Sequence, residues 1–233
     1  MRSRATGKGP PVVFVHGAAG SGQNFAAQVQ AFRDIHTCHF VDLAGHGPSI
    51  EDYAGAVAQF IESLKEPVTL VGHSMGGAIA IEVALRRASL LRGLVLAGTG
   101  CRLPVSEKLL QSFETDYEKA IASVTRYCFS KEVDPELLRR AQREIANVPP
   151  ELVKSDFHHC NAFDRCARIA EIQVPTLVVC GTKDVMTPPP FSEALANAIP
   201  GAVLEWIPDG SHMAMSENPA VFNEILRRFL VLH

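Results

Sequence analysis

Short apolar runs alternate with segments of helical periodicity along most of the chain, and this alternation limits the folds that the sequence can adopt. Six runs have the length of a strand buried on both faces, and they span residues 11–15, 37–41, 68–71, 93–97, 176–180 and 203–207. Between the second and third runs, apolar residues recur at helical spacing from Tyr53 to Leu64. Strands that alternate with helices favour a parallel sheet with helices on both faces. We therefore predict an α/β fold with a mainly parallel sheet of about six strands.

The alternation breaks once, between the fourth and fifth apolar runs. Residues 101–169 contain no convincing strand, and helix starts recur at Asp134-Pro135 and at Pro149-Pro150. This pattern predicts a helical insertion that leaves after the fourth strand and returns before the fifth. We therefore predict a core of residues 1–100 and 170–233 and a helical cap of residues 101–169.

The composition of the 233-residue chain is that of an ordinary globular protein. Hydrophobic residues make up 47% and charged residues 20%, so we expect the chain to fold alone around one core. The formal net charge of −3 speaks against nucleic acid as a partner. No apolar run approaches the ~20 residues that span a bilayer, and residues 1–8 lack the apolar core of a signal peptide. These observations predict a soluble, cytoplasmic protein without a membrane partner.

The six cysteines are scattered along the chain and form no CxxC pair. They give little support to a zinc site or a disulfide framework, so we expect reduced, buried thiols. A metal site at His158, His159 and Cys160 has no accompanying cluster with fixed ligand spacing, and packing is the favoured role there. The sequence thus predicts no bound metal.

A serine with a glycine two residues before it and another two residues after it follows the third apolar run. The segment Gly72-His73-Ser74-Met75-Gly76 fits the G-x-S-x-G turn that lifts a nucleophilic serine above the carboxyl edge of a sheet. A turn this tight strains the serine backbone, and a Cβ at Gly72 or Gly76 would clash. The helix that follows presents the Met75 N–H at its positive end, where an anionic oxygen is stabilised. The motif also occurs by chance, so its context decides its weight.

A serine nucleophile needs a base that accepts its proton and a carboxylate that orients the base. Loops after later strands share the carboxyl edge of the sheet, and they offer Asp184 after the fifth run and His212 after the sixth. The chain order Ser74, Asp184, His212 is the one expected for this turn. Asp209 is the rival acid, although a turn role is favoured for it. A packing role is favoured for His73, which adjoins the serine.

A second glycine-rich stretch covers residues 15–22, directly after the first apolar run. It lacks the Lys-Ser/Thr ending of a P-loop and the spacing of the dinucleotide fingerprint, so we expect no nucleotide or other organic cofactor. The backbone N–H of Ala18 is instead a candidate donor that, together with the Met75 N–H, would hold a developing oxyanion. We expect His16 to organise this loop through hydrogen bonds.

With these residues in place, the chain resembles the α/β-hydrolase superfamily over nearly its whole length. The landmarks that carry the resemblance are His16-Gly17, the turn of residues 42–47, Gly72-His73-Ser74-Met75-Gly76-Gly77, Gly181-x-x-Asp184 and Gly210-Ser211-His212. Within the superfamily, the chain is most similar to small bacterial esterases whose helical cap follows the fourth strand. The resemblance implies Ser74 as nucleophile, His212 as base, Asp184 as acid, and Ala18 and Met75 as oxyanion donors.

Two departures from the family pattern affect these expectations. Members usually carry an antiparallel hairpin before the strand that ends in His-Gly, but only about ten residues precede that strand here. We therefore expect a trimmed sheet whose edge needs a partner, for example a second copy in a homodimer. The arginine common in the family's turn is Ala44 here, so the contact that this arginine makes is not carried over.

The expected activity is hydrolysis of a small-molecule carboxylic ester through an acyl-enzyme on Ser74. Alternatives on the same three residues are thioesterase, lactonase and C–C bond hydrolase activity, and a slow-turnover ligand-binding protein is the alternative from another class. Several apolar side chains of the cap are candidates for lining a substrate pocket, although packing between helices is the favoured role for most of them. They are Leu103, Leu109, Leu110, Phe113, Tyr127, Phe129, Phe157 and Phe163.

Overall fold

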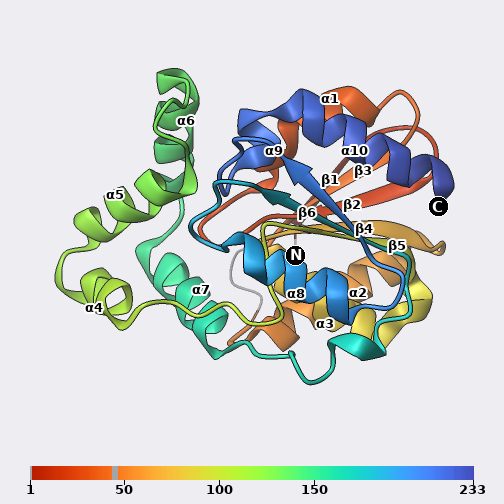
Figure 1. Cartoon of the computed structure of the whole chain (residues 1–233), viewed down its shortest axis with the longest axis horizontal. Helices are drawn as coiled ribbons and strands as arrows, with labels where there is room; N and C mark the ends of the chain where they lie inside the picture. The colour runs from red at the N-terminus through yellow and green to blue at the C-terminus, as the bar shows by residue number, and fades with distance from the viewer. Residues whose placement is uncertain (1, 44–46) are drawn as a thin grey trace.

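The computed structural model describes residues 2–43 and 47–233, and its centre is a sheet of seven strands (Figure 1). In their order across the sheet, the strands are β1 (Arg2–Gly7), β3 (Thr37–Asp42), β2 (Pro11–Val15), β4 (Val68–His73), β5 (Leu91–Ala97), β6 (Thr176–Gly181) and β7 (Val203–Ile207). Every pairing among β2 to β7 is parallel. The predicted α/β fold with a mainly parallel sheet is therefore confirmed.

The strand β1 is the part of the sheet that the sequence analysis missed. It pairs antiparallel with β3, from Arg2 opposite Asp42 to Gly7 opposite Thr37. All six of its residues are exposed, so its sequence has no apolar periodicity that would reveal a strand. The prediction that the β3 edge lacks an antiparallel neighbour is wrong. Because β1 covers this edge, the argument for a homodimer from an uncovered edge does not hold.

The strand β7 is less buried than its apolar run predicted. Val203 is 53% exposed, and only Ile207 is fully buried, because β7 forms the far edge of the sheet and pairs with β6 alone. An edge strand has one neighbour, so part of its surface stays in contact with solvent.

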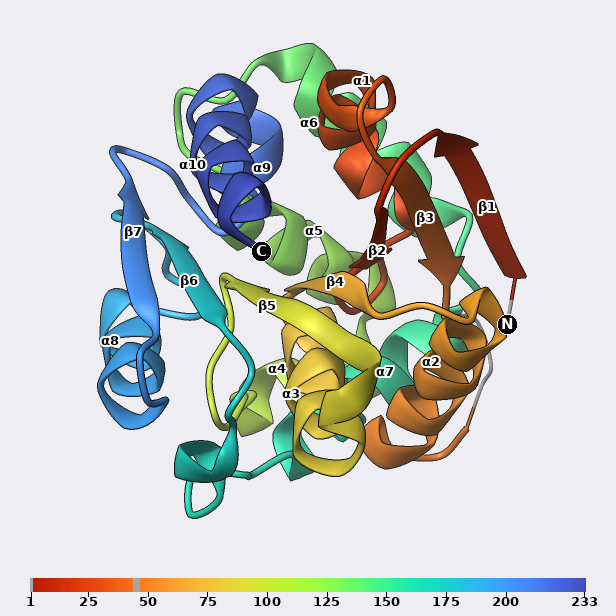
Figure 2. The ribbon, with the colours of Figure 1, turned by 90° about the vertical axis from the view of Figure 1, so that its right-hand side faces the viewer.

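Helices cover both faces of the sheet, as the sequence predicted (Figure 2). One face packs against α2 (Ile50–Leu64), α3 (Met75–Arg87) and α8 (Pro189–Ala198). The other face packs against α1 (Ala26–Phe32), α9 (Ala214–Glu217) and α10 (Pro219–Leu232). Side chains alternate between the faces along a strand, so Val13 and Val15 join the first core and Val12 and Phe14 join the second.

Four α-helices follow β5 and precede β6, and the insertion that they form stands to the left of the sheet in Figure 1. They are α4 (Glu107–Thr115), α5 (Tyr117–Cys128), α6 (Pro135–Ala146) and α7 (Pro150–Ala162). The helix α6 begins where the sequence indicated, because the Asp134 carboxylate accepts the Glu136 N–H at 2.8 Å. The insertion has a small core of its own, which includes Phe113, Val153 and Phe157.

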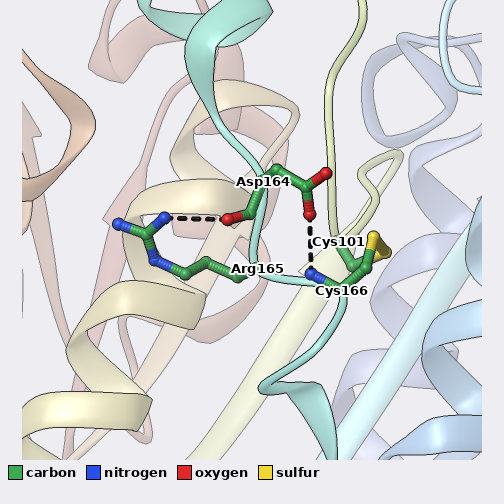
Figure 3. Close-up of a disulfide and its surroundings, with 4 residues drawn as sticks. All are labelled: Cys101, Asp164, Arg165 and Cys166. Atoms are coloured by element: carbon green, nitrogen blue, oxygen red, sulfur yellow. Dashed lines mark hydrogen bonds between the residues drawn. A yellow bond between two sulfur atoms is a disulfide. The ribbon is translucent and has the colours of Figure 1, made fainter.

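A disulfide joins the two ends of this insertion, which corrects the expectation that all six thiols are reduced (Figure 3). It links Cys101 and Cys166, which lie 65 residues apart in sequence, so no local cysteine spacing reveals it. The Arg165 N–H donates to the Cys101 carbonyl at 2.8 Å, and the Arg165 guanidinium pairs with the buried Glu82 at 2.7 Å. The other four cysteines, which are Cys38, Cys128, Cys160 and Cys180, are free.

Candidate active site

Ser74 lies on the sharp turn between β4 and α3, with φ 54° and ψ −119°. This positive φ is rare for a residue with a side chain, and the predicted backbone strain is confirmed. The glycines are needed for space: a Cβ on Gly72 would lie 2.2 Å from Gly76 O, and one on Gly76 would lie 2.1 Å from Val15 O. The Thr99 hydroxyl donates to Ser74 O at 2.8 Å and holds the turn from the loop after β5.

Ser74 and His212 line the same cavity, which has a volume of about 610 Å³. The cavity lies between the sheet edge and the insertion, since Gly17 and Ala18 line one side and residues of α4 to α7 line the other. Among the described residues, the Ser74 hydroxyl takes part in no hydrogen bond. The structure thus leaves this hydroxyl available to a molecule that enters the cavity.

The His212 ring is bound to the Asp184 carboxylate. The distance from His212 Nδ1 to Asp184 Oδ2 is 2.9 Å, and the two residues are 5% and 2% exposed. Burial alone would raise the pKa of Asp184, but the charge and hydrogen bond of His212, together with hydrogen bonds from Thr187, lower it below its ordinary value. The ionised carboxylate therefore accepts the Nδ1–H and leaves Nε2 as the basic nitrogen.

Thr187 is a member of this site that the sequence analysis missed. Its hydroxyl donates to Asp184 Oδ2 at 2.9 Å, and its backbone N–H donates to Oδ1 at the same distance. The Met186 N–H donates to Oδ1 at 2.8 Å. These donors fix the orientation of the carboxylate. A threonine three residues after an aspartate in a turn is the only local signal for this role.

The loop that carries His212 is held from three directions. The Cys128 carbonyl at the end of α5 accepts the Ser211 hydroxyl at 2.8 Å and the Met213 N–H at 3.0 Å. Glu217 accepts the Ser211 N–H at 3.1 Å. His73 Nε2 donates to the His212 carbonyl at 3.0 Å, and burial, followed by the charge of His212, lowers the pKa of His73 to about 3. The His73 ring is therefore neutral, and its hydrogen bond holds the backbone of His212 in place.

Asp209 does not contact the His212 ring among the described hydrogen bonds. It has φ 56°, its side chain is 78% exposed, and it pairs with Lys183 at 2.7 Å. Its position is that of a turn residue at the surface. The structure therefore brings Asp184, not Asp209, to His212.

The glycine loop after β2 packs directly against Ser74. A Cβ on Gly17 would lie 3.0 Å from the Ser74 Cβ, so the loop approaches this closely because residue 17 is a glycine. His16 Nδ1 donates to the Gly17 carbonyl at 2.8 Å, and its Nε2 accepts the Leu43 N–H at 3.2 Å. His16 therefore ties this loop to the end of β3. Of the family turn at residues 42–47, residues 44–46, including Ala44, lie outside the described part of the chain.

The two candidate oxyanion donors lie beside Ser74. Ala18 follows Gly17 in the loop that lines the cavity, and Met75 is the first residue of α3. Among the described hydrogen bonds, none is donated by either backbone N–H. Two such donors near the serine oxygen are the arrangement that stabilises an oxyanion.

The apolar residues of the insertion serve both roles, since most of those that line the cavity also pack in the hydrophobic clusters. Five of them line the cavity, namely Leu103, Leu109, Tyr127, Phe129 and Phe157. The other three pack between elements and do not line the cavity, namely Leu110, Phe113 and Phe163.

The segment at His158, His159 and Cys160 belongs to α7 and serves packing contacts. The His159 ring lies edge-on to Tyr53 at 5.8 Å, and Cys160 is buried. Within residues 2–43 and 47–233, no group of three His, Cys, Asp or Glu residues could hold a metal ion. No helix in this part of the chain is both long and apolar enough to cross a membrane.

Comparison with known proteins identifies the family of this chain. The model of the alpha/beta hydrolase family matches residues 12–225. The chain belongs to the alpha/beta hydrolase family. It is an enzyme of the hydrolase class, and the family to which its sequence motifs pointed is confirmed.

Several relatives are esterases or other hydrolases. The chain is 28% identical to a pimeloyl-[acyl-carrier protein] methyl ester esterase of Neisseria meningitidis, over 82% of this chain and 67% of that protein. It is 28% identical to a putative carbamate hydrolase RutD of Pseudomonas syringae, over 95% of this chain and 93% of that protein. The solved structure of Est816, an N-acyl homoserine lactone degrading enzyme, matches with a TM-score of 0.88 and 29% identity, over 98% of this chain and 96% of that one.

Proposed function

We propose that this protein hydrolyses carboxylic esters through an acyl-enzyme on Ser74, with His212 as general base and Asp184 as its orienting carboxylate. The observation that carries the proposal is the buried His212–Asp184 hydrogen bond of 2.9 Å at the cavity that Ser74 also lines. A serine hydroxyl is a weak nucleophile, so it needs a base that a carboxylate holds in the correct tautomer. The esterases among the relatives support the same reaction class.

In this mechanism, Ser74 Oγ attacks the ester carbonyl while His212 Nε2 accepts its proton. The negative charge that develops on the carbonyl oxygen is stabilised by the backbone N–H groups of Ala18 and Met75, and the latter lies at the positive end of α3. His212 then returns the proton to the leaving alcohol. A water molecule, activated by the same imidazole, attacks the acyl-enzyme and releases the acid.

We further propose that residues 101–169 form a cap that selects the acyl group. The cavity of about 610 Å³ is large enough for a substantial acyl chain, and its insertion side carries aromatic and aliphatic side chains such as Phe129 and Phe157. Uncharged esters with an apolar acyl group fit this lining. A panel of esters graded by acyl length is the measurement that checks this, and a longer apolar acyl group is expected to lower KM.

Lactone hydrolysis is a second candidate, favoured by the similarity to Est816 along nearly the whole chain. A lactone is an internal ester, so the same attack on the carbonyl opens its ring. Parallel assays with an N-acyl homoserine lactone and an open-chain ester of equal acyl length separate the two. A higher kcat/KM for the lactone would make lactonase activity the primary function.

The experiment that tests the proposed function uses a para-nitrophenyl ester with wild-type protein, Ser74→Ala and Ser63→Ala. Ser63 is exposed on α2 and does not line the cavity, so its variant is a matched control that loses a serine hydroxyl outside the proposed site. Ser74→Ala is expected to lose nearly all turnover, and Ser63→Ala to keep it. Full activity in Ser74→Ala would refute the proposal. A burst followed by little steady turnover would favour the slow-turnover binding alternative.

The proposed substrate is a small molecule, and the cytoplasmic location stays a prediction. The Cys101–Cys166 disulfide is the observation that opposes it, because disulfides persist mainly in oxidising environments. Titration of free thiols in freshly extracted protein decides the question: six free thiols would support a reducing location, and four an oxidising one.

A further inference from the structure

The glycine loop beside Ser74 has a backbone conformation that needs support from another element. Ala19 has φ 55°, a conformation that residues with a side chain rarely adopt. The Gly20 N–H donates to Gly17 O at 3.1 Å, so the loop turns sharply within four residues. Ala18, the proposed oxyanion donor, lies inside this turn. A small change in the turn would therefore move the Ala18 N–H relative to the Ser74 hydroxyl.

The support comes from Asp156 on α7, which lies in the insertion. Its Oδ2 accepts the Ala19 N–H at 3.1 Å, and its Oδ1 accepts the Tyr53 hydroxyl of α2 at 3.2 Å. Asp156 is only 6% exposed. A carboxylate this buried is costly unless donors satisfy it, and these two donors come from the sheet domain, 137 and 103 residues away in sequence. Asp156 thus fastens the insertion to the loop that approaches Ser74.

We propose that Asp156 is a positioning residue for the oxyanion hole, because its bond to the Ala19 N–H fixes the turn that directs the Ala18 N–H. The inference rests on the proposed function, since an oxyanion forms only if Ser74 attacks a carbonyl. It assigns the insertion a second role: besides lining the cavity, α7 sets the geometry of a loop in the reacting centre.

This role makes the loop sensitive to acid. Burial raises the pKa of Asp156, and the hydrogen bonds from Ala19 and Tyr53 lower it by a smaller amount. The resulting pKa of Asp156 is about 6. The titratable groups described beside it are Tyr53 from α2 and Cys160 on α7, and burial raises the pKa of each, so both stay neutral near pH 6. His159, three residues further along α7, packs edge-on against the Tyr53 ring at 5.8 Å, and burial lowers its pKa. Protonation of Asp156 weakens a charge-assisted bond to the Ala19 N–H and loosens the turn.

The test compares Asp156→Ala and Asp156→Asn with wild-type protein, and Asp116→Ala serves as the matched control. Asp116 is an exposed carboxylate of the same insertion that caps α5 through the Lys119 N–H, and no described hydrogen bond joins it to the loop. Asp156→Ala is expected to lower kcat by about ten- to a hundredfold with KM changed by less than about threefold, since a displaced oxyanion donor acts on the transition state. Asp156→Asn keeps an acceptor for the Ala19 N–H and is expected to retain kcat within about threefold at pH 8.

A second readout does not depend on substrate. The amide ¹H–¹⁵N signal of Ala19 is expected to shift with a midpoint near pH 6 in wild-type protein and to show no such step in Asp156→Asn. Equal kcat values for folded Asp156→Ala and wild type would overturn the inference, as would equal losses in Asp156→Ala and Asp116→Ala. If Asp156→Ala does not fold, Asp156→Asn decides: an unchanged acid limb of its pH–kcat profile overturns the inference.

Failure of the proposed function has a different signature. Wild-type protein would then hydrolyse no ester although its Ala19 amide titrates near pH 6. Asp156 would in that case support the loop structurally but play no part in catalysis. An Ala19 amide that does not titrate, in a wild-type enzyme that hydrolyses esters, refutes the positioning role alone.

Discussion

The sheet with its flanking helices and the helical insertion are ordered by different interactions. The helix α3, which begins beside Ser74, has ten buried residues, whereas α6 in the insertion has none. The insertion shares some apolar side chains with the two cores, such as Leu103 and Phe129, and it is also attached through specific contacts. These include the Cys101–Cys166 disulfide, the Asp156–Ala19 bond and the Cys128 carbonyl beside His212. The comparison indicates that the sheet edge supplies the reacting groups, while the insertion adjusts their positions. Substitutions in the two regions should therefore differ in size and in kind.

The largest effect is expected at the sheet edge, from Asp184→Asn. An asparagine keeps an acceptor for the Thr187 N–H, so the fold is retained, but its amide cannot hold the His212 Nδ1–H in the required tautomer. The expected result is a loss in kcat of about a thousandfold or more. Asp209→Asn, on the exposed neighbour that pairs with Lys183, is the control and should stay within about twofold. Similar activity of the two variants would show that Asp184 does not orient the base.

An intermediate effect is expected where the insertion joins the sheet, from loss of the disulfide. The bond closes a loop of 65 residues, and its removal is expected to lower the free energy of unfolding by about 2–4 kcal/mol because the unfolded chain gains freedom. The kcat should change by less than about threefold, since the reacting groups lie on the sheet. Chemical denaturation of wild type with and without a dithiol, beside Cys101→Ser/Cys166→Ser, measures both quantities. An unchanged denaturation midpoint after reduction, or a large loss of kcat, would contradict the view that the insertion contributes stability while the sheet carries the reacting groups.

The effect that is smallest at neutral pH concerns the pH dependence of stability, arises from His73 in the core and grows as the pH falls. The folded protein holds the pKa of this buried ring at about 3, while the unfolded chain binds the proton near 6.5. The unfolded state therefore binds more protons in between, so the stability that His73 contributes is complete above pH 6.5 and is lost as the pH falls. His73→Gln keeps a donor for the His212 carbonyl but does not titrate.

The variant is expected to reduce the pH slope of the unfolding free energy by about 1.4 kcal/mol per pH unit between about pH 4 and 6. Urea titrations at several pH values measure this slope. Asp156 acts in the opposite direction, because its raised pKa makes stability fall as the pH rises toward about 6. Identical slopes for His73→Gln and wild type would contradict the burial of a neutral His73.

The patterns that predicted the fold were local. Each parallel strand was a short apolar run, and the runs at residues 11–15 and 203–207 match β2 and β7 to the residue. The turn at Ser74 and the residues Asp184 and His212 could be chosen because each lies in the segment that follows a predicted strand. Parallel strands bring their carboxyl ends to one edge of the sheet, so residues that follow different strands in the sequence lie close together in the fold.

The features that could not be predicted depend on contacts between distant segments or on exposed residues. The strand β1 consists of exposed residues, so it carries no hydrophobic period. Asp156 is one aspartate on a helix, and its partner Ala19 lies 137 residues away. The pairing of Cys101 with Cys166 likewise depends on how the insertion leaves and rejoins the sheet. Such contacts follow from the folded arrangement and leave no periodic trace in the sequence.

The central claim, that the Ser74 hydroxyl is made reactive by His212, is tested most directly by covalent trapping. A fluorophosphonate is incubated with wild-type protein and with His212→Ala, and the modified residue is located by peptide mass spectrometry. The account predicts rapid labelling of Ser74 in wild-type protein and labelling slowed by about a thousandfold or more in His212→Ala. Labelling of another residue, or equal labelling rates in the two proteins, would contradict it.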